Sequence, residues 1–139
     1  MSVESARKLA FVAHAGQEDR AGEAYLDHVS RVALSCDSED AQIAALLHDS
    51  IEDTELVTER MVRSMFGDEI ADAVVTLTHD DGREYRSYIE DVAENDLATQ
   101  VKLADLEDNL DLARLDDLSP EDLDRARKYG EAHRTLLRV

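Results

Sequence analysis

Apolar residues recur at spacings of three and four along most of this chain, and that spacing places them on one face of an α-helix. In residues 3–17 the inward positions are Ala6, Leu9, Ala10, Ala13 and His14. In residues 25–34 they are Tyr25, Val29, Val32 and Ala33. The pattern therefore predicts an amphipathic helix in each of these segments.

The same period continues to the end of the chain. A third helix is predicted from a cap at Asp37 or Ser38 to residue 50, and a fourth from a cap at Thr58 to residue 66. Three more are predicted over residues 68–77, 85–94 and 97–115. The last helix is predicted to follow a cap at Ser119. One proline and five glycines leave little punctuation for short strands. We expect an all-α fold, a compact bundle of about seven to eight helices with at most one short ribbon.

Length and composition narrow the class of protein. The 139 residues suit one hydrophobic core, so we expect residues 1–139 to form a single domain. Cys36 is the only cysteine, which excludes an internal disulfide and a cysteine-rich zinc site. No apolar run is long enough to suggest a membrane span or a secretory signal. We expect a soluble, cytoplasmic protein.

The formal net charge is −18, with acids spread along the whole chain. Nucleic-acid binding depends on neutralising phosphates with lysine and arginine, so nucleic acid is a poor candidate partner. Most of the charge is explained by a solvated acidic surface. A small anionic substrate is still compatible with the charge if a bound cation supplies a local positive field.

The stretch "LLHDSIEDTEL" interrupts the apolar pattern. The run "IAALL" stops at His48 and Asp49. Glu52 lies four residues after His48, and Asp53 lies four residues after Asp49, so the two residues of each such pair share a helix face if the helix persists. Acidic residues are mostly exposed. By itself the stretch is therefore better explained as a polar helix end than as a site.

Two other positions favour a site. His28 lies in line with Tyr25 and Val32, and Asp105 lies in an apolar stripe of the helix predicted over 97–115. Each alone is explained by a hydrogen-bonded core residue, but a buried carboxylate needs a partner. With His48 and Asp49 they supply two imidazoles and two carboxylates from three helices, a mixed set that a divalent transition metal accepts. Asn109, one turn after Asp105, would face the same cavity.

Three segments of the chain resemble a known family. In order they are "AHAGQEDRAGEAYLDH", "ALLHDSIEDT" and "VKLADLEDNL". Together they are similar to the HD-domain metal-dependent phosphohydrolases, and specifically to the hydrolase domain of the RelA/SpoT stringent-response proteins and the small alarmone (ppGpp) hydrolases. The resemblance covers roughly residues 9–112. A histidine, then His-Asp-x-x-Glu-Asp, then Asp-x-x-x-Asn is a specific pattern.

The resemblance implies an HD-domain helical bundle and a role for each matching residue. His28, His48, Asp49 and Asp105 would bind one divalent ion, manganese first, with iron or zinc as alternatives. Glu52 and Asp53 would act on a metal-activated water, and Asn109 would help to hold the nucleotide. The implied reaction removes the 3′-pyrophosphate from guanosine tetra- or pentaphosphate.

The sequence also offers candidates for contact with the substrate. The basic candidates for phosphate binding are Arg20, Arg83, Arg86, Lys102 and Arg114, and except for Lys102 a surface charge is the favoured alternative. Tyr25 would provide an aromatic wall for a base, with a core tyrosine as the alternative. The family carries an arginine and a second basic residue before the first metal histidine, and the arginine stacks on guanine. Asp19 and Arg20 stand at that pair here.

Three functions therefore stay open. The first is a manganese-dependent hydrolase of (p)ppGpp, and the second is the same chemistry on another nucleotide or phosphate ester. The third is a catalytically silent nucleotide-binding regulatory module. Intact Glu52 and Asp53 argue against the third function, and Asp19 is what separates the second from the first. The sequence does not determine the oligomeric state.

Overall fold

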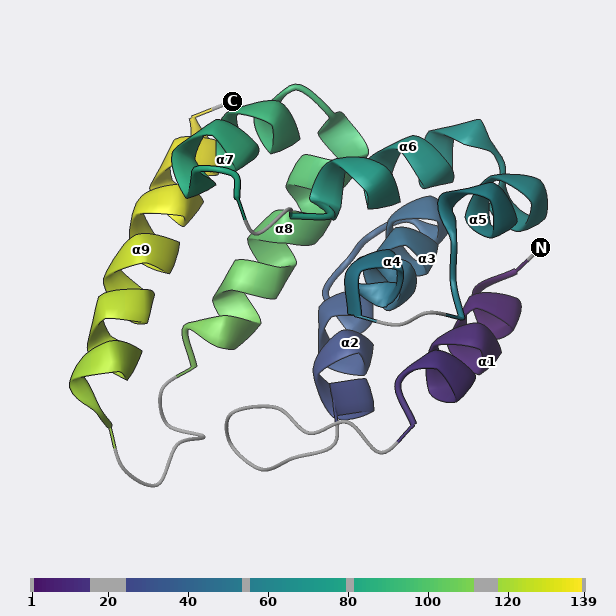
Figure 1. Cartoon of the computed structure of the whole chain (residues 1–139), viewed down its shortest axis with the longest axis horizontal. Coiled ribbons are helices and arrows are strands. Elements are labelled where there is room, and N and C mark those ends of the chain that lie inside the picture. The colour runs from purple at the N-terminus through teal and green to yellow at the C-terminus, as the bar shows by residue number, and fades with distance from the viewer. Residues whose placement is uncertain (1, 16–24, 54–55, 80–81, 112–117, 139) are drawn as a thin grey trace.

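A computed structural model describes residues 2–15, 25–53, 56–79, 82–111 and 118–138 (Figure 1). Within these ranges the regular structure is entirely helical, which confirms the predicted all-α bundle. The helices are α1 (Val3–Ala13), α2 (Tyr25–Leu34), α3 (Glu39–Leu47), α4 (Ser50–Asp53), α5 (Glu59–Phe66), α6 (Asp68–Leu77), α7 (Tyr85–Ala93), α8 (Asp96–Asn109) and α9 (Pro120–Leu137). All of them except α4, a single turn, are at least eight residues long.

Helix α3 is the centre of the hydrophobic core. It packs against α1, α2, α6 and α8, and its apolar side chains are buried around nearly the whole helix. Three of them are the alanines Ala41, Ala44 and Ala45, whose small side chains let neighbouring helices approach closely. A helix that is apolar on all sides belongs in a core.

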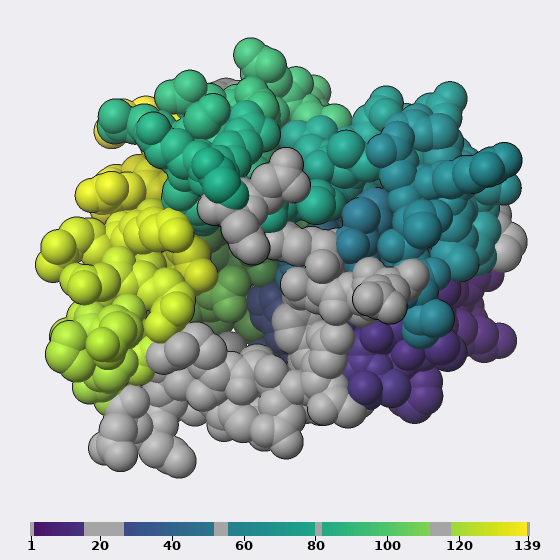
Figure 2. Space-filling view, viewed as in Figure 1, coloured from purple at the N-terminus to yellow at the C-terminus, as the bar shows by residue number. Residues whose placement is uncertain are grey.

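Helix α8 joins this core to the other end of the bundle. It packs against α2, α3 and α6 on one side and against α7 and α9 on the other. Helix α9 lies at the opposite end of the molecule from α1, and α7 covers the top of the α8–α9 pair (Figures 1 and 2). Side chains on α8 can therefore meet residues from both halves of the bundle.

The predicted helix starts at Ser38, Thr58 and Ser119 are confirmed. Each of these side chains accepts a hydrogen bond from a backbone N–H in the first turn, at 3.1, 3.2 and 3.1 Å respectively. At α9 the Asp122 carboxylate also accepts from the Ser119 N–H, which completes a capping box. Gly67, with a φ of 96°, separates α5 from α6 in a conformation that favours glycine.

Three predicted helix ends were wrong. The third helix was expected to reach Ser50, but α3 ends at Leu47 because the His48 ring bonds the carbonyl of Ala45 and the backbone tightens into a turn before α4. The first helix ends at Ala13 instead of residue 17, and α8 ends at Asn109 instead of residue 115. Residues 16–17 and 112–115 lie outside the described ranges. Among the helices that are described, none has the length and apolar content that crossing a bilayer requires.

Truncating the core of α3 should be costly. Leu46 is 1% exposed, so Leu46→Ala is expected to lower the free energy of unfolding by about 2–5 kcal/mol through lost burial and a residual cavity. Leu34, at the end of α2, is 80% exposed, and the matched Leu34→Ala change should cost less than about 0.5 kcal/mol. Urea denaturation of both variants measures the difference. Equal destabilisation would contradict the central position of α3.

Candidate metal centre

Four sequence-predicted residues come together where α2, the turn after α3 and α8 meet. His28 lies on α2, His48 and Asp49 form the turn that follows α3, and Asp105 lies on α8. His28, His48 and Asp105 are 4%, 2% and 4% exposed, whereas Asp49 is half-buried. Because α2, α3 and α8 all pack on one another, the convergence follows from the core itself.

The Asp105 carboxylate lies at the centre of the cluster. Its Oδ1 atom is 2.9 Å from His28 Nε2 and 3.4 Å from His48 Nε2. The Asn109 side-chain amide donates to the same oxygen at 3.2 Å, and Lys102 Nζ donates to Oδ2 at 2.9 Å. Both carboxylate oxygens therefore have polar partners in a nearly water-free position.

The His48 ring has one satisfied nitrogen and one that is not. Nδ1 lies 2.6 Å from the Ala45 carbonyl oxygen, so Nδ1 must carry the hydrogen and the neutral ring has its lone pair on Nε2. Nε2 is buried and has no hydrogen-bond partner among the described residues. Carboxylate oxygens of Asp49 and Asp105 nevertheless lie 3.1 and 3.4 Å away. The lone pair and the two carboxylates are all electron-rich, so a cation between them would stabilise this arrangement.

The donor atoms fit a divalent metal ion. Ligand atoms of His28, His48 and Asp49 all lie within 4.8 Å of one another, and Asp105 Oδ1 approaches both imidazole nitrogens. Nitrogen and carboxylate oxygen together suit manganese, iron or zinc. The chain thus contains a His/Asp cluster that could hold a metal, as the sequence predicted, although the ligand roles stay a prediction.

The pKa values of the two histidines and of Asp105 describe how the cluster binds protons in the absence of a metal ion. Burial by itself would lower the pKa of both histidines, but the neighbouring carboxylates outweigh burial and raise the pKa of His28 and, more strongly, of His48. Burial would raise the pKa of Asp105, but Lys102 and the two histidines hold that pKa well below its usual range. A proton and a metal ion would therefore compete for the same histidine nitrogens.

Two residues next to the cluster, Asp108 and Arg31, were not among the site residues predicted from the sequence. Asp108 Oδ2 lies 2.6 Å from His28 Nδ1, and Arg31 bonds both oxygens of Asp108, Nε at 2.6 Å and NH2 at 3.1 Å. Asp108 is three residues after Asp105 and Arg31 is three residues after His28. Residues three apart share a face of a helix, so this spacing would have placed Arg31 beside His28 and Asp108 beside Asp105.

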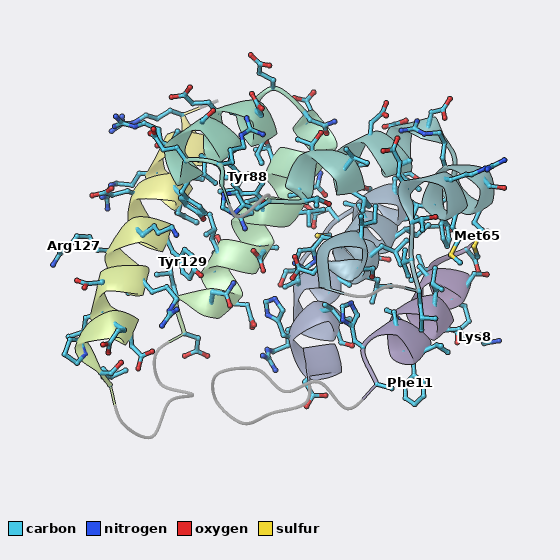
Figure 3. The ribbon with its side chains drawn as sticks, viewed as in Figure 1. Lys8, Phe11, Met65, Tyr88, Arg127 and Tyr129 are labelled. Carbon is cyan, nitrogen blue, oxygen red and sulfur yellow. The ribbon has the colours of Figure 1, made fainter. Side chains whose placement is uncertain are left out.

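A group of tyrosine rings lies next to the Lys102–Asp105 ion pair. Lys102 Nζ lies 5.4 Å from the ring centroid of Tyr88, whose hydroxyl donates to the Leu77 carbonyl at 2.6 Å. The ring centroid of Tyr85, also on α7, lies 5.7 Å from that of Tyr88 and 6.3 Å from that of Tyr129 on α9. Figure 3 shows Tyr88 beside α7 and Tyr129 on the side of α9 that faces α8. The side chains of Lys102 and Asp105 are only 13% and 6% exposed, and this low exposure to water strengthens their attraction.

The remaining predicted residues are placed only in part. Glu52 and Asp53 lie in α4, directly after the His48–Asp49 turn, and Tyr25 begins α2, but their side chains are outside the description. Asp19, Arg20 and Arg114 lie outside the described residues. Arg83 pairs with Asp91, and Arg86 lines a cavity of about 440 Å³ between α7 and α9.

Known proteins resemble this chain in sequence. It is 42% identical over 69 residues to chloroplastic RSH1 of Oryza sativa subsp. japonica, whose name assigns it provisionally to the GTP diphosphokinases; the match covers 47% of this chain and 8% of that protein. It is 31% identical over 120 residues to the guanosine-3′,5′-bis(diphosphate) 3′-pyrophosphohydrolase of Aquifex aeolicus (strain VF5), covering 78% and 17% respectively. The chain spans less than a fifth of the length of these curated relatives.

The fold has a solved counterpart, and a family model covers most of the chain. The structure described as a metazoan ortholog of SpoT, which hydrolyses ppGpp and plays a role in starvation responses, matches with a TM-score of 0.80 and 28% sequence identity. That match covers 98% of this chain and 85% of the other. A model for the HD domain matches residues 6–108, which include all four residues of the His/Asp cluster. The chain therefore belongs to the HD domain family.

Proposed function

We propose that the protein is a metal-dependent phosphohydrolase that removes the 3′-pyrophosphate from guanosine tetra- or pentaphosphate. The observation that carries the proposal is the buried cluster of two imidazoles and two carboxylates on α2, the α3–α4 turn and α8. Support for the substrate comes from the Aquifex relative and the metazoan SpoT ortholog, whose names state this reaction and this nucleotide. In this proposal residues 1–139 form one HD-type domain that acts in the cytoplasm.

The proposed ligands of one divalent ion are His28, His48, Asp49 and Asp105. Manganese is the first candidate, and iron or zinc are the alternatives. When bound, such an ion lowers the pKa of a water molecule and neutralises charge on a phosphoryl oxygen. The ion would also offset part of the negative charge of a chain that carries −18, so that an anionic nucleotide could approach.

Glu52 and Asp53 are the proposed catalytic acids. Their backbone lies in α4, the turn of helix directly after His48 and Asp49. A carboxylate one turn beyond the metal ligands can accept the proton of the attacking water through its side-chain oxygen. Water attacks the phosphorus that is bonded to the ribose 3′ oxygen, the P–O3′ bond breaks, and the 3′ oxygen leaves with a proton.

The proposed substrate contacts are Asn109, Lys102, Arg20 and Tyr25. Asn109 is exposed and bonds Asp105, so its amide lies at the edge of the cluster. Lys102 is largely committed to Asp105, and this makes Arg20 the more important candidate for phosphate binding. Asp19 favours a second candidate function, the same chemistry on another nucleotide or phosphate ester, because an acid cannot stack on guanine as arginine does.

A substrate panel tests the proposal. With Mn²⁺, the protein is expected to convert guanosine 3′,5′-bis(diphosphate) into pyrophosphate and guanosine 5′-diphosphate in equal amounts. The panel should include the adenosine analogue, GTP, ATP and an aryl phosphate, with released phosphate and pyrophosphate measured separately. Equal rates on the guanosine and adenosine substrates would favour the second function. Nucleotide binding without any hydrolysis would instead favour a silent regulatory module.

Metal binding should stabilise the protein in a pH-dependent way. Mn²⁺ is expected to raise the melting temperature more at about pH 8 than at about pH 6, because protons displace the ion from histidine nitrogens. The carboxylates raise the pKa of His28 and His48, so the loss should begin above the usual imidazole range. Calorimetry across this pH range measures the effect. His48→Ala should abolish the metal-dependent shift, and an unchanged shift would contradict the assignment.

The acids should act in catalysis without binding the metal. Glu52→Gln and Asp53→Asn are each expected to keep Mn²⁺ and the fold and to lower kcat by about 10²–10⁴-fold, the usual cost of losing a general base. His48→Ala should lose both metal and activity. Metal analysis, a thermal melt and initial rates on the three variants separate these outcomes. Full activity in both acid variants would refute their catalytic role, and metal loss would make them ligands.

A further inference from the structure

We infer that Asp108 and Arg31 position His28 for metal binding: Asp108 holds the ring with its hydrogen on Nδ1, and Arg31 holds Asp108. This inference rests on the metal site proposed above. It assigns a role to two residues outside the four-residue cluster.

The contacts form a continuous chain of charged hydrogen bonds between two helices. His28 Nδ1 donates to Asp108 Oδ2 at 2.6 Å, and Arg31 donates from Nε to Oδ1 at 2.6 Å and from NH2 to Oδ2 at 3.1 Å. The Asp108 side chain is 12% exposed and that of His28 is 5% exposed. Asp108 is therefore held from two sides in a place with little water, where such bonds are strong.

The orientation of His28 follows from these bonds. An imidazole can offer Nε2 to a metal only when Nδ1 carries the hydrogen, and a carboxylate at Nδ1 fixes that tautomer and makes the ring a stronger ligand. His28 Nε2 points at Asp105 Oδ1, 2.9 Å away, which is inside the cluster. The hydrogen bond that His28 donates to Asp108 thus determines which nitrogen faces the proposed metal position.

The two histidines of the cluster are held by different kinds of acceptor. His48 Nδ1 bonds the neutral carbonyl of Ala45, whereas His28 Nδ1 bonds a carboxylate whose charge Arg31 partly balances. Arg31 also prevents the Asp108 side chain from turning towards solvent, because its Nε and NH2 groups bond both oxygens. We expect Asp108 to set the affinity of His28 for the ion and Arg31 to tune it.

The alternative is an ordinary ion pair between α2 and α8 that stabilises the fold and nothing more. The two interpretations differ in what they predict for metal affinity. A purely structural pair would change the stability of the metal-free protein and leave the dissociation constant of the folded protein for Mn²⁺ unchanged. A positioning pair changes that constant even where the protein is fully folded.

Titration of Mn²⁺ into folded protein, with free ion measured by electron paramagnetic resonance, tests the inference. Asp108→Asn keeps the size of the side chain and is expected to weaken Mn²⁺ binding by about 10–100-fold, the usual effect of losing such a partner. Arg31→Gln should weaken it by a smaller factor, and the double variant should be no weaker than Asp108→Asn, because both act through one contact. Asp111→Asn, which removes an exposed charge just beyond α8, is the matched control and should bind as the wild type does.

A second measurement reads the ring directly. In zinc-loaded, ¹⁵N-labelled protein the nuclear magnetic resonance spectrum should show the hydrogen of His28 on Nδ1, and Asp108→Asn should shift or broaden that signal while the signals of His48 stay in place. If Asp108→Asn does not fold, Arg31→Gln tests the same link with the smaller loss. Wild-type affinity in every variant that folds would overturn the inference.

The outcomes separate this inference from the proposed function. A wild-type protein that binds Mn²⁺ through His48 and weakens in Asp108→Asn, yet hydrolyses no nucleotide, refutes the proposed reaction and supports the positioning role. A wild-type protein that binds no divalent ion overturns the metal site and the positioning role together. Tight metal binding in wild type and in Asp108→Asn alike overturns the positioning role alone.

Discussion

The buried carboxylate of Asp105 is the constraint on which the centre of this molecule depends. A carboxylate that is 4% exposed needs partners for both oxygens, because an unpaired buried charge costs several kcal/mol. Its hydrogen-bond partners are His28 on α2 and Lys102 and Asn109 on α8 itself, and His48 Nε2, at the end of α3, lies 3.4 Å from the same carboxylate. The packing of α2, α3 and α8 and the electrostatics of the cluster are therefore one arrangement.

The end of α3 completes the site. The His48 ring bonds the Ala45 carbonyl, which ends the helix at Leu47 and starts a new turn of helix at Ser50. The same bond leaves Nε2 of His48 buried between two carboxylates. A local hydrogen bond thus fixes both the chain direction into α4 and the atom that faces the cluster. His14, which follows directly after α1, supports this turn, since its Nε2 lies 3.3 Å from the buried Ser50 hydroxyl.

Most of the fold could be predicted from the sequence because its signals are local. Helical spacing and the caps at Ser38, Thr58 and Ser119 depend on neighbouring residues, and they gave the correct elements except α4, whose residues 51–53 were expected in a connection. His28 and Asp105 could be assigned to the core because they interrupt apolar stripes. The end of α3 could not, since a bond from an imidazole to its own helix has no signature in the sequence. Asp108 was missed because an acid near a helix end is usually a surface residue.

The proposed metal site has four ligands, which are His28, His48, Asp49 and Asp105. A crystal grown with Mn²⁺ and measured at a wavelength where manganese scatters anomalously tests it most directly. We expect one strong anomalous peak at about 2.0–2.3 Å from Nε2 of both histidines and from carboxylate oxygens of both aspartates. A cluster without a peak at saturating Mn²⁺, or a peak bound by other residues, would contradict it.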